Sequence, residues 1–138
     1  MDTKIVVAPA LLLADDNPAL LSTLVQMLQA EYRVVAALPN GTSVLDNIAA
    51  LRPDIVILDI SLGDMTGFEV ARRLQRDRCS AKIIFLTVHE DPDFVNAAFD
   101  IGAHGYVFKS RVTEDLTRAI SAVSEGGRFA SSTTPSVH

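Results

Sequence analysis

The chain has 138 residues, enough for one domain with a sizeable core, and its 49% apolar and 21% charged residues exclude a disordered chain. Its net charge of −5 argues against direct binding of nucleic acid, because phosphate-binding proteins normally carry a basic surface. The single cysteine, Cys79, excludes an internal disulfide framework and fits a reducing compartment, so we expect a cytoplasmic protein.

The first apolar stretch, residues 5–14, has two interpretations. With Lys4 before it and Ala8-Pro9-Ala10 as a cleavage site, it resembles a short signal peptide. Alternatively, Ala10–Ala14 is the first core strand and Met1–Val7 is a loose leader. We favour the strand, because cleavage would remove a central element of the domain. The stretch is also too short to cross a bilayer, so no membrane association is expected.

Strand and helix patterns then alternate five times along the chain. The predicted strands are Ala10–Ala14, Arg33–Leu38, the apolar run between Asp54 and Asp59, Lys82–Thr87 and Gly105–Phe108. Apolar residues at helical spacing follow each strand, in the stretches 21–28, 44–51, 68–74, 94–101 and 116–123. This alternation predicts an α/β fold, a doubly wound parallel sheet with helices on both faces.

Local signals mark several helix ends. Asn17 is expected to cap the first helix, with Pro18 in its first turn. Gly67 is expected to begin the third helix, and Gly102 suits a left-handed end of the fourth. Thr113 is the predicted N-cap of the last helix.

Four of the five predicted strands end in a residue capable of chemistry. These residues are the pair Asp15 and Asp16, then Asp59, Thr87 and Lys109. The carboxyl ends of parallel strands meet at one edge of a sheet, so we expect these side chains to converge there. The second strand lacks such a residue and is predicted to lie at the outside of the sheet.

The converging residues suit phosphoryl chemistry. Three carboxylates repel one another, and a hard cation such as Mg2+, which prefers oxygen ligands, relieves that repulsion. Asp59 is then a candidate nucleophile toward phosphorus, with Thr87 as a hydroxyl donor and Lys109 as a cation for phosphoryl oxygens.

Each residue alone has a plainer interpretation. Asp15-Asp16 is a typical cap and dipole pair before a helix, Asp59 a turn former, Thr87 a loop hydroxyl and Lys109 a solvated charge. The ordered set, each member at a strand end, is what favours a functional site.

The whole set resembles the receiver domain of bacterial two-component response regulators. The resemblance rests on Asp15-Asp16, Asp59, Thr87 and Gly105-Tyr106-Val107-Phe108-Lys109, and it covers roughly residues 10–127. It implies a flavodoxin-like five-stranded parallel sheet of order 2-1-3-4-5 with five helices.

The resemblance also implies a site. Asp59 would accept a phosphoryl group from a sensor histidine kinase. Asp15 or Asp16, Asp59 and the backbone carbonyl of Ser61 would hold Mg2+, and the phosphoryl group would contact the two residues at the ends of the fourth and fifth strands, Thr87 and Lys109.

Tyr106 resembles the aromatic switch position of the family, which turns inward as Thr87 moves toward the phosphate. An ordinary aromatic residue on an edge strand is an equally good interpretation. The surface formed by the fourth helix, fifth strand and fifth helix is expected to carry output or homodimer contacts.

Three residues depart from the family pattern. Ser110 follows Lys109 where many receivers have proline, which puts the family's cis peptide bond in doubt. Val88 is larger than usual beside Thr87 and is expected to narrow access to the site. Gly63 replaces a frequent proline, so a more mobile loop is expected there.

The expected domain organisation is a receiver at residues 8–128 and a linker or tail at residues 129–138. Leu116–Phe129 resembles the last receiver helix of regulators with a LuxR-type helix-turn-helix output, which does not follow in this chain. The chain is therefore either an excised or a stand-alone receiver, and the linker-like tail favours the first. DNA would be bound only through such an output domain.

The function expected is Mg2+-dependent phosphoacceptance that controls an output, without turnover of an external substrate. A phosphohydrolase would need a carboxylate two residues after the nucleophile, where this chain has Ser61. A flavodoxin-like module that binds nucleotide or flavin would need a glycine-rich or hydroxyl-rich loop after the first strand, where Asp-Asp-Asn-Pro stands instead. A receiver that no longer phosphorylates and only binds a partner stays open because of Val88.

Overall fold

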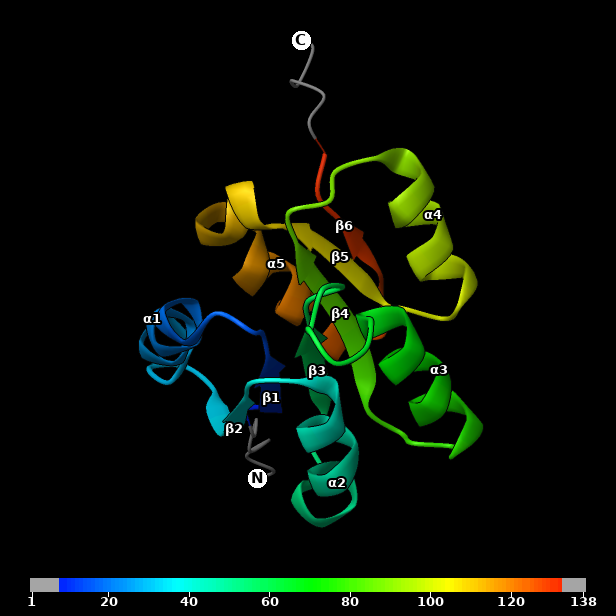
Figure 1. The fold of residues 1–138 in the computed structure, drawn as a ribbon. Coiled ribbons are helices and arrows are strands. Elements are labelled where there is room, and N and C mark those ends of the chain that lie inside the picture. The colour runs from blue at the N-terminus through cyan, green and yellow to red at the C-terminus, as the bar shows by residue number, and fades with distance from the viewer. Residues whose placement is uncertain (1–7, 133–138) are drawn as a thin grey trace, which may run out of the picture.

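In the computed structural model, which describes residues 8–132, the strands form one parallel sheet in the order β2-β1-β3-β4-β5-β6 (Figure 1). The strands are β1 Ala10–Ala14, β2 Arg33–Leu38, β3 Ile55–Leu58, β4 Lys82–Thr87, β5 Gly105–Phe108 and β6 Phe129–Ala130. The helices are α1 Pro18–Leu28, α2 Gly41–Leu51, α3 Gly67–Arg76, α4 Pro92–Asp100 and α5 Val112–Ser124, with a 3-10 turn η1 at Lys109–Arg111. The flavodoxin-like order 2-1-3-4-5 is thus confirmed, and β2 lies at the outside as predicted.

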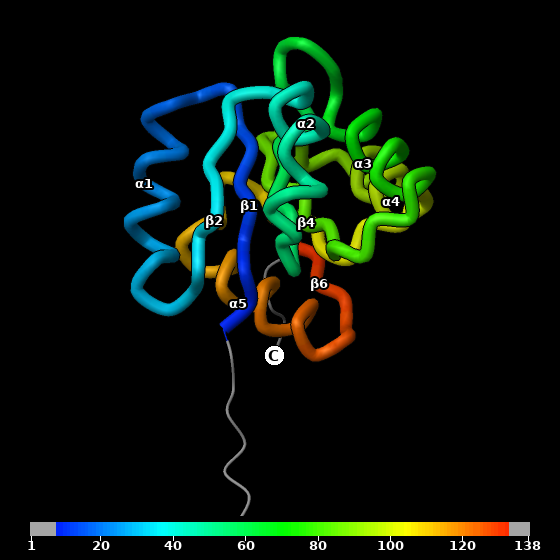
Figure 2. The backbone as a smooth tube through the Cα atoms, turned by 90° about the horizontal axis from the view of Figure 1, so that it is seen from below, coloured from blue at the N-terminus to red at the C-terminus, as the bar shows by residue number. Residues whose placement is uncertain are grey.

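Two layers of helices bury the two faces of the sheet. Helices α1 and α5 cover one face, and α2, α3 and α4 cover the other (Figure 2). Neighbouring strand residues serve opposite faces, as the pleat requires: Leu11 and Leu13 pack toward α1 and α5, whereas Leu12 and Ala14 pack toward α2 and α3. Every residue of β1 and β3 is buried, which explains their uninterrupted apolar sequences.

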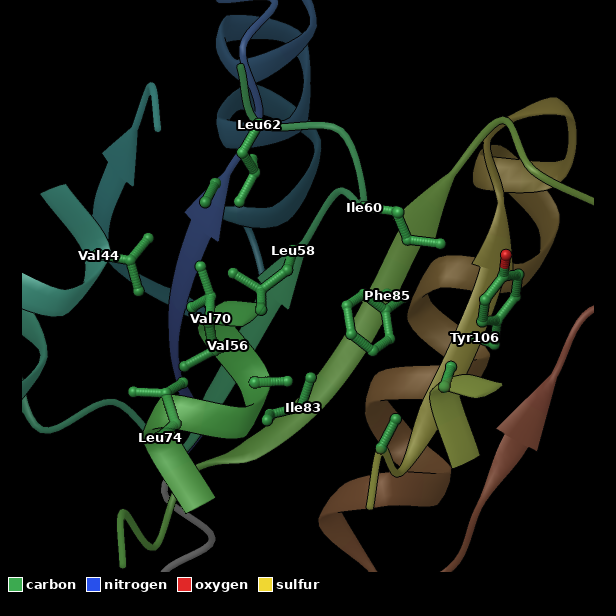
Figure 3. Packing of buried hydrophobic residues seen from close by; sticks show 14 of the residues in the cluster. Val44, Val56, Leu58, Ile60, Leu62, Val70, Leu74, Ile83, Phe85 and Tyr106 are labelled. Carbon is green, nitrogen blue, oxygen red and sulfur yellow. The ribbon is translucent and has the colours of Figure 1, made fainter. Parts of the chain in front are cut away.

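The core beneath α3 and α4 extends across the sheet to β5. Figure 3 shows Phe85 of β4 and Tyr106 of β5 on the same face as Val56 and Leu58 of β3. The ring centroids of Phe85 and Tyr106 lie 6.4 Å apart. The ring of Phe85 also lies 5.3 Å, between centroids, from that of Phe68 in α3, so aromatic packing ties β4 and β5 to the helix layer on that face.

Three of the four predicted helix-end signals are confirmed. Asn17 accepts a hydrogen bond from the backbone N–H of Leu20, Gly67 is the first residue of α3, and Gly102 has φ +95°. The prediction for Thr113 was wrong. Helix α5 begins at Val112 because η1 leads from β5 directly into it, so no residue there has the extended backbone that a capping side chain needs.

The C-terminal boundary differs from the expectation of a linker starting at residue 129. Phe129 and Ala130 form a sixth, short strand that pairs in parallel with β5. The backbone N–H of Phe129 donates to the carbonyl of His104, and that of Ser131 donates to the carbonyl of Tyr106. The chain thus returns along β5 and pairs with part of the edge that β5 would otherwise expose. The expected leader and the end of the expected tail, residues 1–7 and 133–138, lie outside the described residues.

No helix within residues 8–132 is both long enough and apolar enough to cross a membrane.

Candidate functional site

The residues predicted to accept phosphate, bind the metal and contact the phosphoryl group stand at one edge of the sheet. Asp15 follows β1, Asp59 follows β3, Thr87 closes β4 and Lys109 follows β5. The register aligns these ends, with Ala14 opposite Leu58 and Thr87 opposite Phe108. The sheet topology therefore brings together residues that are up to 94 positions apart, from Asp15 to Lys109.

Three carboxylates meet at this edge. Asp15, Asp16 and Asp59 each offer an oxygen, and these oxygens lie within 4.8 Å of one another. Asp15 and Asp59 are 2% and 5% exposed, whereas Asp16 is open to solvent. Asp15 is further fixed by the backbone N–H of Asn17, which donates to its carboxylate at 2.9 Å. The cluster is thus a preformed acidic site with one open side.

The ammonium group of Lys109 lies between two of these carboxylates. Its Nζ is 2.7 Å from Asp15 Oδ2 and 2.7 Å from Asp59 Oδ2. Burial raises the pKa of Asp15, and the hydrogen bond from Lys109 only partly opposes that. Burial acts to lower the pKa of Lys109, but its hydrogen bonds to Asp15 and Asp59 outweigh burial and raise it. Lys109 therefore remains charged at neutral pH.

The charges of the cluster do not balance. Three carboxylates face one ammonium group, and the ligand atoms that these carboxylates offer are all oxygens, which are hard ligands. A hard divalent cation suits such a set, because it takes oxygen ligands and keeps part of its water shell. The residues present therefore fit the predicted magnesium site. Ser61 stands beside them, with its backbone N–H 3.3 Å from Asp59 Oδ1.

Thr87 and Tyr106 are linked through the loop after β4. Both side chains are fully buried. The Thr87 hydroxyl accepts a hydrogen bond from the backbone N–H of His89 at 3.4 Å, and the Tyr106 hydroxyl donates to the carbonyl of His89 at 2.6 Å. Burial, and then the negative charges of Asp59 and Asp91, raise the pKa of Tyr106. Tyr106 thus points inward, and β6 covers its strand, so it is not an aromatic residue on an edge strand.

The three departures from the family pattern have different outcomes. The peptide bond between Lys109 and Ser110 is trans, since the described residues contain no cis bond. Gly63 has φ +84°, which proline cannot adopt and which favours glycine, and the greater mobility of this loop stays a prediction. Val88 is 66% exposed, and its effect on access to the site stays a prediction.

Two polar arrangements near the site were missed in the sequence. The carboxylate of Asp64, after β3, binds the first turn of α2. The buried carboxylate of Asp115 binds both Arg111 and Ser131. Only the i, i+4 spacing of Arg111 and Asp115 was visible as a signal. The other contacts join residues 16 or more positions apart in the chain.

The comparisons with known proteins agree with this geometry. A profile described as the response regulator receiver domain matches residues 11–121. The uncharacterized transcriptional regulatory protein YvfU of Bacillus subtilis is 35% identical over 120 residues, which are 86% of this chain and 60% of that protein. The nitrate/nitrite response regulator protein NarP of Escherichia coli is 34% identical over 85% of this chain and 55% of its own length. The chain thus spans little more than half of these relatives.

The crystal structure of a LuxR family two-component response regulator from Aurantimonas is also similar, with a TM-score of 0.84 and 30% identity over 88% of this chain and 89% of that one. The strand order, the acidic site and these likenesses lead to one conclusion. The chain belongs to the response regulator receiver domain family and is the receiver domain of a two-component response regulator.

Proposed function

We propose that this receiver is a Mg2+-dependent phosphoacceptor in which Asp59 takes a phosphoryl group from the phosphohistidine of a sensor histidine kinase. One observation carries the proposal. The buried Asp59 carboxylate lies within 4.8 Å of two further carboxylates and 2.7 Å from the ammonium group of Lys109. This supports a proposed nucleophile and a proposed cation site that share one positive charge, that of Lys109.

The residues that would hold Mg2+ are Asp15, Asp16, Asp59 and the backbone carbonyl of Ser61. When bound, the ion supplies positive charge that neutralises the incoming phosphoryl oxygens and orients them. The buried carboxylates of Asp15 and Asp59 are held in place by Lys109 before any ligand arrives. These contacts support a site that is preorganised for a hard cation.

In the transfer step, a carboxylate oxygen of Asp59 attacks phosphorus and an acyl phosphate bond forms. The P–N bond to the donor imidazole breaks, and the bonding electrons stay on that nitrogen, which takes up a proton. Lys109 supplies a positive charge for one phosphoryl oxygen, since its raised pKa keeps it protonated. The Thr87 hydroxyl, now bound to the backbone of His89, supplies a donor for another.

A signal then leaves the site through the loop after β4. The Thr87 hydroxyl can donate to the phosphoryl group while it accepts from the backbone N–H of His89, so a movement of Thr87 toward the phosphate would pull on this loop through that hydrogen bond. Tyr106 holds the same loop residue through its carbonyl, which makes Tyr106 the proposed switch residue. The α4, β5 and α5 surface next to this loop is the proposed output or homodimer surface.

The proposed output is transcription, through a DNA-binding domain elsewhere in the whole protein, and the proposed setting is the cytoplasm. This receiver would make and break only its own acyl phosphate and would not turn over an external substrate. The residue two positions after Asp59 is Ser61, which lacks the carboxylate that a hydrolase uses as acid and base.

The test is the intact mass of the protein after incubation with acetyl phosphate, with and without Mg2+. We expect one phosphoryl adduct that requires Mg2+ and is absent from Asp59→Ala. The Asp77→Ala variant, which removes an exposed carboxylate remote from the site, serves as the control and should phosphorylate normally. A folded wild-type protein without an adduct would refute phosphoacceptance and favour a receiver that only binds a partner.

A further inference from the structure

A single carboxylate fastens the β3–α3 loop (residues 60–66) to the first turn of α2. Asp64 accepts hydrogen bonds from the backbone N–H groups of Gly41 and Thr42, both at 2.9 Å, and from the Thr42 hydroxyl at 2.6 Å. The Thr42 hydroxyl, followed by these two N–H groups, lowers the pKa of Asp64 to about 2. Asp64 is exposed, so burial in the core does not hold it there.

The neighbouring residue makes a second contact with the same turn. A Cβ atom added to Gly41 would lie 2.4 Å from Cγ of Met65, so the Met65 side chain packs directly on the Gly41 backbone. At Gly63 an added Cβ would meet nothing within 4 Å, so that side of the loop is open. Figure 2 shows the loop rising beside the start of α2. The outer half of the loop therefore depends on α2 for its position.

The inner half of the same loop carries the site. Ser61 lies two residues after Asp59 and pairs with Thr66 in an isolated antiparallel bridge. The backbone N–H of Gly67 donates to the carbonyl of Ile60 at 2.7 Å, which closes the base of the loop. The segment that carries Ser61 is thus held by hydrogen bonds at the base of the loop and, through Asp64, at its tip.

We propose that Asp64 is a positioning residue for the cation site. By clamping the loop tip to α2, it holds the Ser61 backbone carbonyl where it can bind Mg2+ beside Asp59. This inference rests on the function proposed above. Asp64 itself does not touch the cation, and its effect reaches the Ser61 carbonyl through the backbone of Gly63 and Leu62.

The experiment measures the Kd for Mg2+ of the unphosphorylated chain by isothermal titration calorimetry. We expect Asp64→Ala to bind Mg2+ about tenfold more weakly than the wild type, at the lower end of the effects that loss of a support for a metal ligand commonly has. Asp64→Asn retains one acceptor oxygen, so its Kd for Mg2+ should lie between that of the wild type and that of Asp64→Ala.

Asn40→Ala is the matched control. It removes another cap of the same helix end, since the Asn40 side chain accepts from the backbone N–H of Ser43 at 2.8 Å, but it leaves the loop fastened. Its Kd should equal that of the wild type, although the helix end is weakened. A second readout is amide hydrogen exchange at Ser61 and Leu62, which should accelerate in Asp64→Ala and stay unchanged in Asn40→Ala.

The outcomes separate the two proposals. Equal Mg2+ affinity in wild type and Asp64→Ala would overturn the positioning role and leave the proposed function intact. Equal weakening in Asp64→Ala and Asn40→Ala would also overturn it, because the effect would then come from helix stability. A folded wild type that does not bind Mg2+ would refute the proposed function, and the positioning role with it.

Discussion

At the scale of single residues, Lys109 offsets the repulsion between the buried carboxylates of the acidic site. Its ammonium group is the positive charge that lies 2.7 Å from two buried carboxylates, Asp15 and Asp59. Ion pairs of this kind add little compared with apolar packing, but removal of one partner leaves the other charges buried and uncompensated. Lys109 therefore has a structural role in addition to its proposed contact with the phosphoryl group.

We predict that Lys109→Ala lowers the free energy of unfolding at neutral pH by about 2–4 kcal/mol in the absence of Mg2+. Urea titrations measure this, with the exposed Arg72→Ala as a control for loss of charge. Adding Asp15→Asn to Lys109→Ala should restore part of the stability. If Lys109→Ala is as stable as Arg72→Ala, the buried carboxylates do not depend on the ammonium group.

The stabilisation that Lys109→Ala removes should also depend on pH. The pKa of Lys109 is higher in the folded than in the unfolded chain. Its contribution to the free energy of unfolding is therefore complete at pH values below its pKa in the unfolded chain. The contribution is lost as pH rises through the folded pKa. The difference in unfolding free energy between wild type and Lys109→Ala should therefore shrink in alkaline solution.

At the scale of elements, β6 is joined to the site edge by a buried polar cluster. The Ser131 hydroxyl donates to Asp115 of α5 at 2.7 Å and accepts from the backbone N–H of Phe108, the last residue of β5, at 3.1 Å. Arg111 adds a hydrogen bond to Asp115 at 2.9 Å. Asp115 is 3% exposed, so its charge depends on these partners. The segment after α5 is therefore an integral part of the fold.

We predict that Ser131→Ala lowers the free energy of unfolding by about 1–3 kcal/mol, because it leaves Asp115 and the Phe108 N–H each one partner short in a buried place. Truncation after Arg128 should cost more, since it also removes the β5–β6 hydrogen bonds. Denaturant unfolding measures both. A chain ending at Arg128 that is as stable as the full chain would show that β6 contributes nothing.

This cluster also has a defined response to acid. Burial acts to raise the pKa of Asp115, but the hydrogen bonds from Arg111 and Ser131 outweigh it and lower the pKa. The resulting stabilisation is present at pH values above the pKa of Asp115 in the unfolded chain. It is lost as pH falls through the pKa of Asp115 in the folded chain. The difference between wild type and Ser131→Ala should therefore narrow in acid.

At the scale of the whole molecule, the acidic edge opposes folding until a cation or a positive group balances it. The site places three carboxylates within 4.8 Å of one another, in a chain whose net charge is already −5. Any ligand that binds only the folded state stabilises it by mass action.

We predict that Mg2+ at about 100 times its Kd raises the free energy of unfolding by about 2.7 kcal/mol. The melting temperature should rise with Mg2+ concentration in the wild type and change little in Asp59→Ala. Calorimetric melts with Mg2+ and with Na+ at equal ionic strength separate binding from screening. An identical rise in both salts would mean that no specific cation site exists.

The sequence pattern by itself determined that the sheet is parallel and at which edge the site lies, whereas the strand order was implied by the resemblance to receiver domains. Apolar runs too long for a solvated face require buried parallel strands, and such strands bring Asp15, Asp59, Thr87 and Lys109 to a common edge. Some helix starts could also be predicted, such as the one marked by Asn17 before Pro18. A capping side chain acts over only three or four residues, so its signal is local in the sequence.

Only the tertiary structure decided the features that depend on contacts between residues far apart in the sequence. Thr113 carries a local cap signal, but the turn η1 overrides it by leading β5 straight into α5. Strand β6 pairs with β5 and Asp64 binds α2 only because the fold brings these segments side by side. Hydrogen bonds between polar groups far apart in the chain leave no periodic pattern in the sequence. They depend on how whole elements pack, which is why they appeared only in the folded molecule.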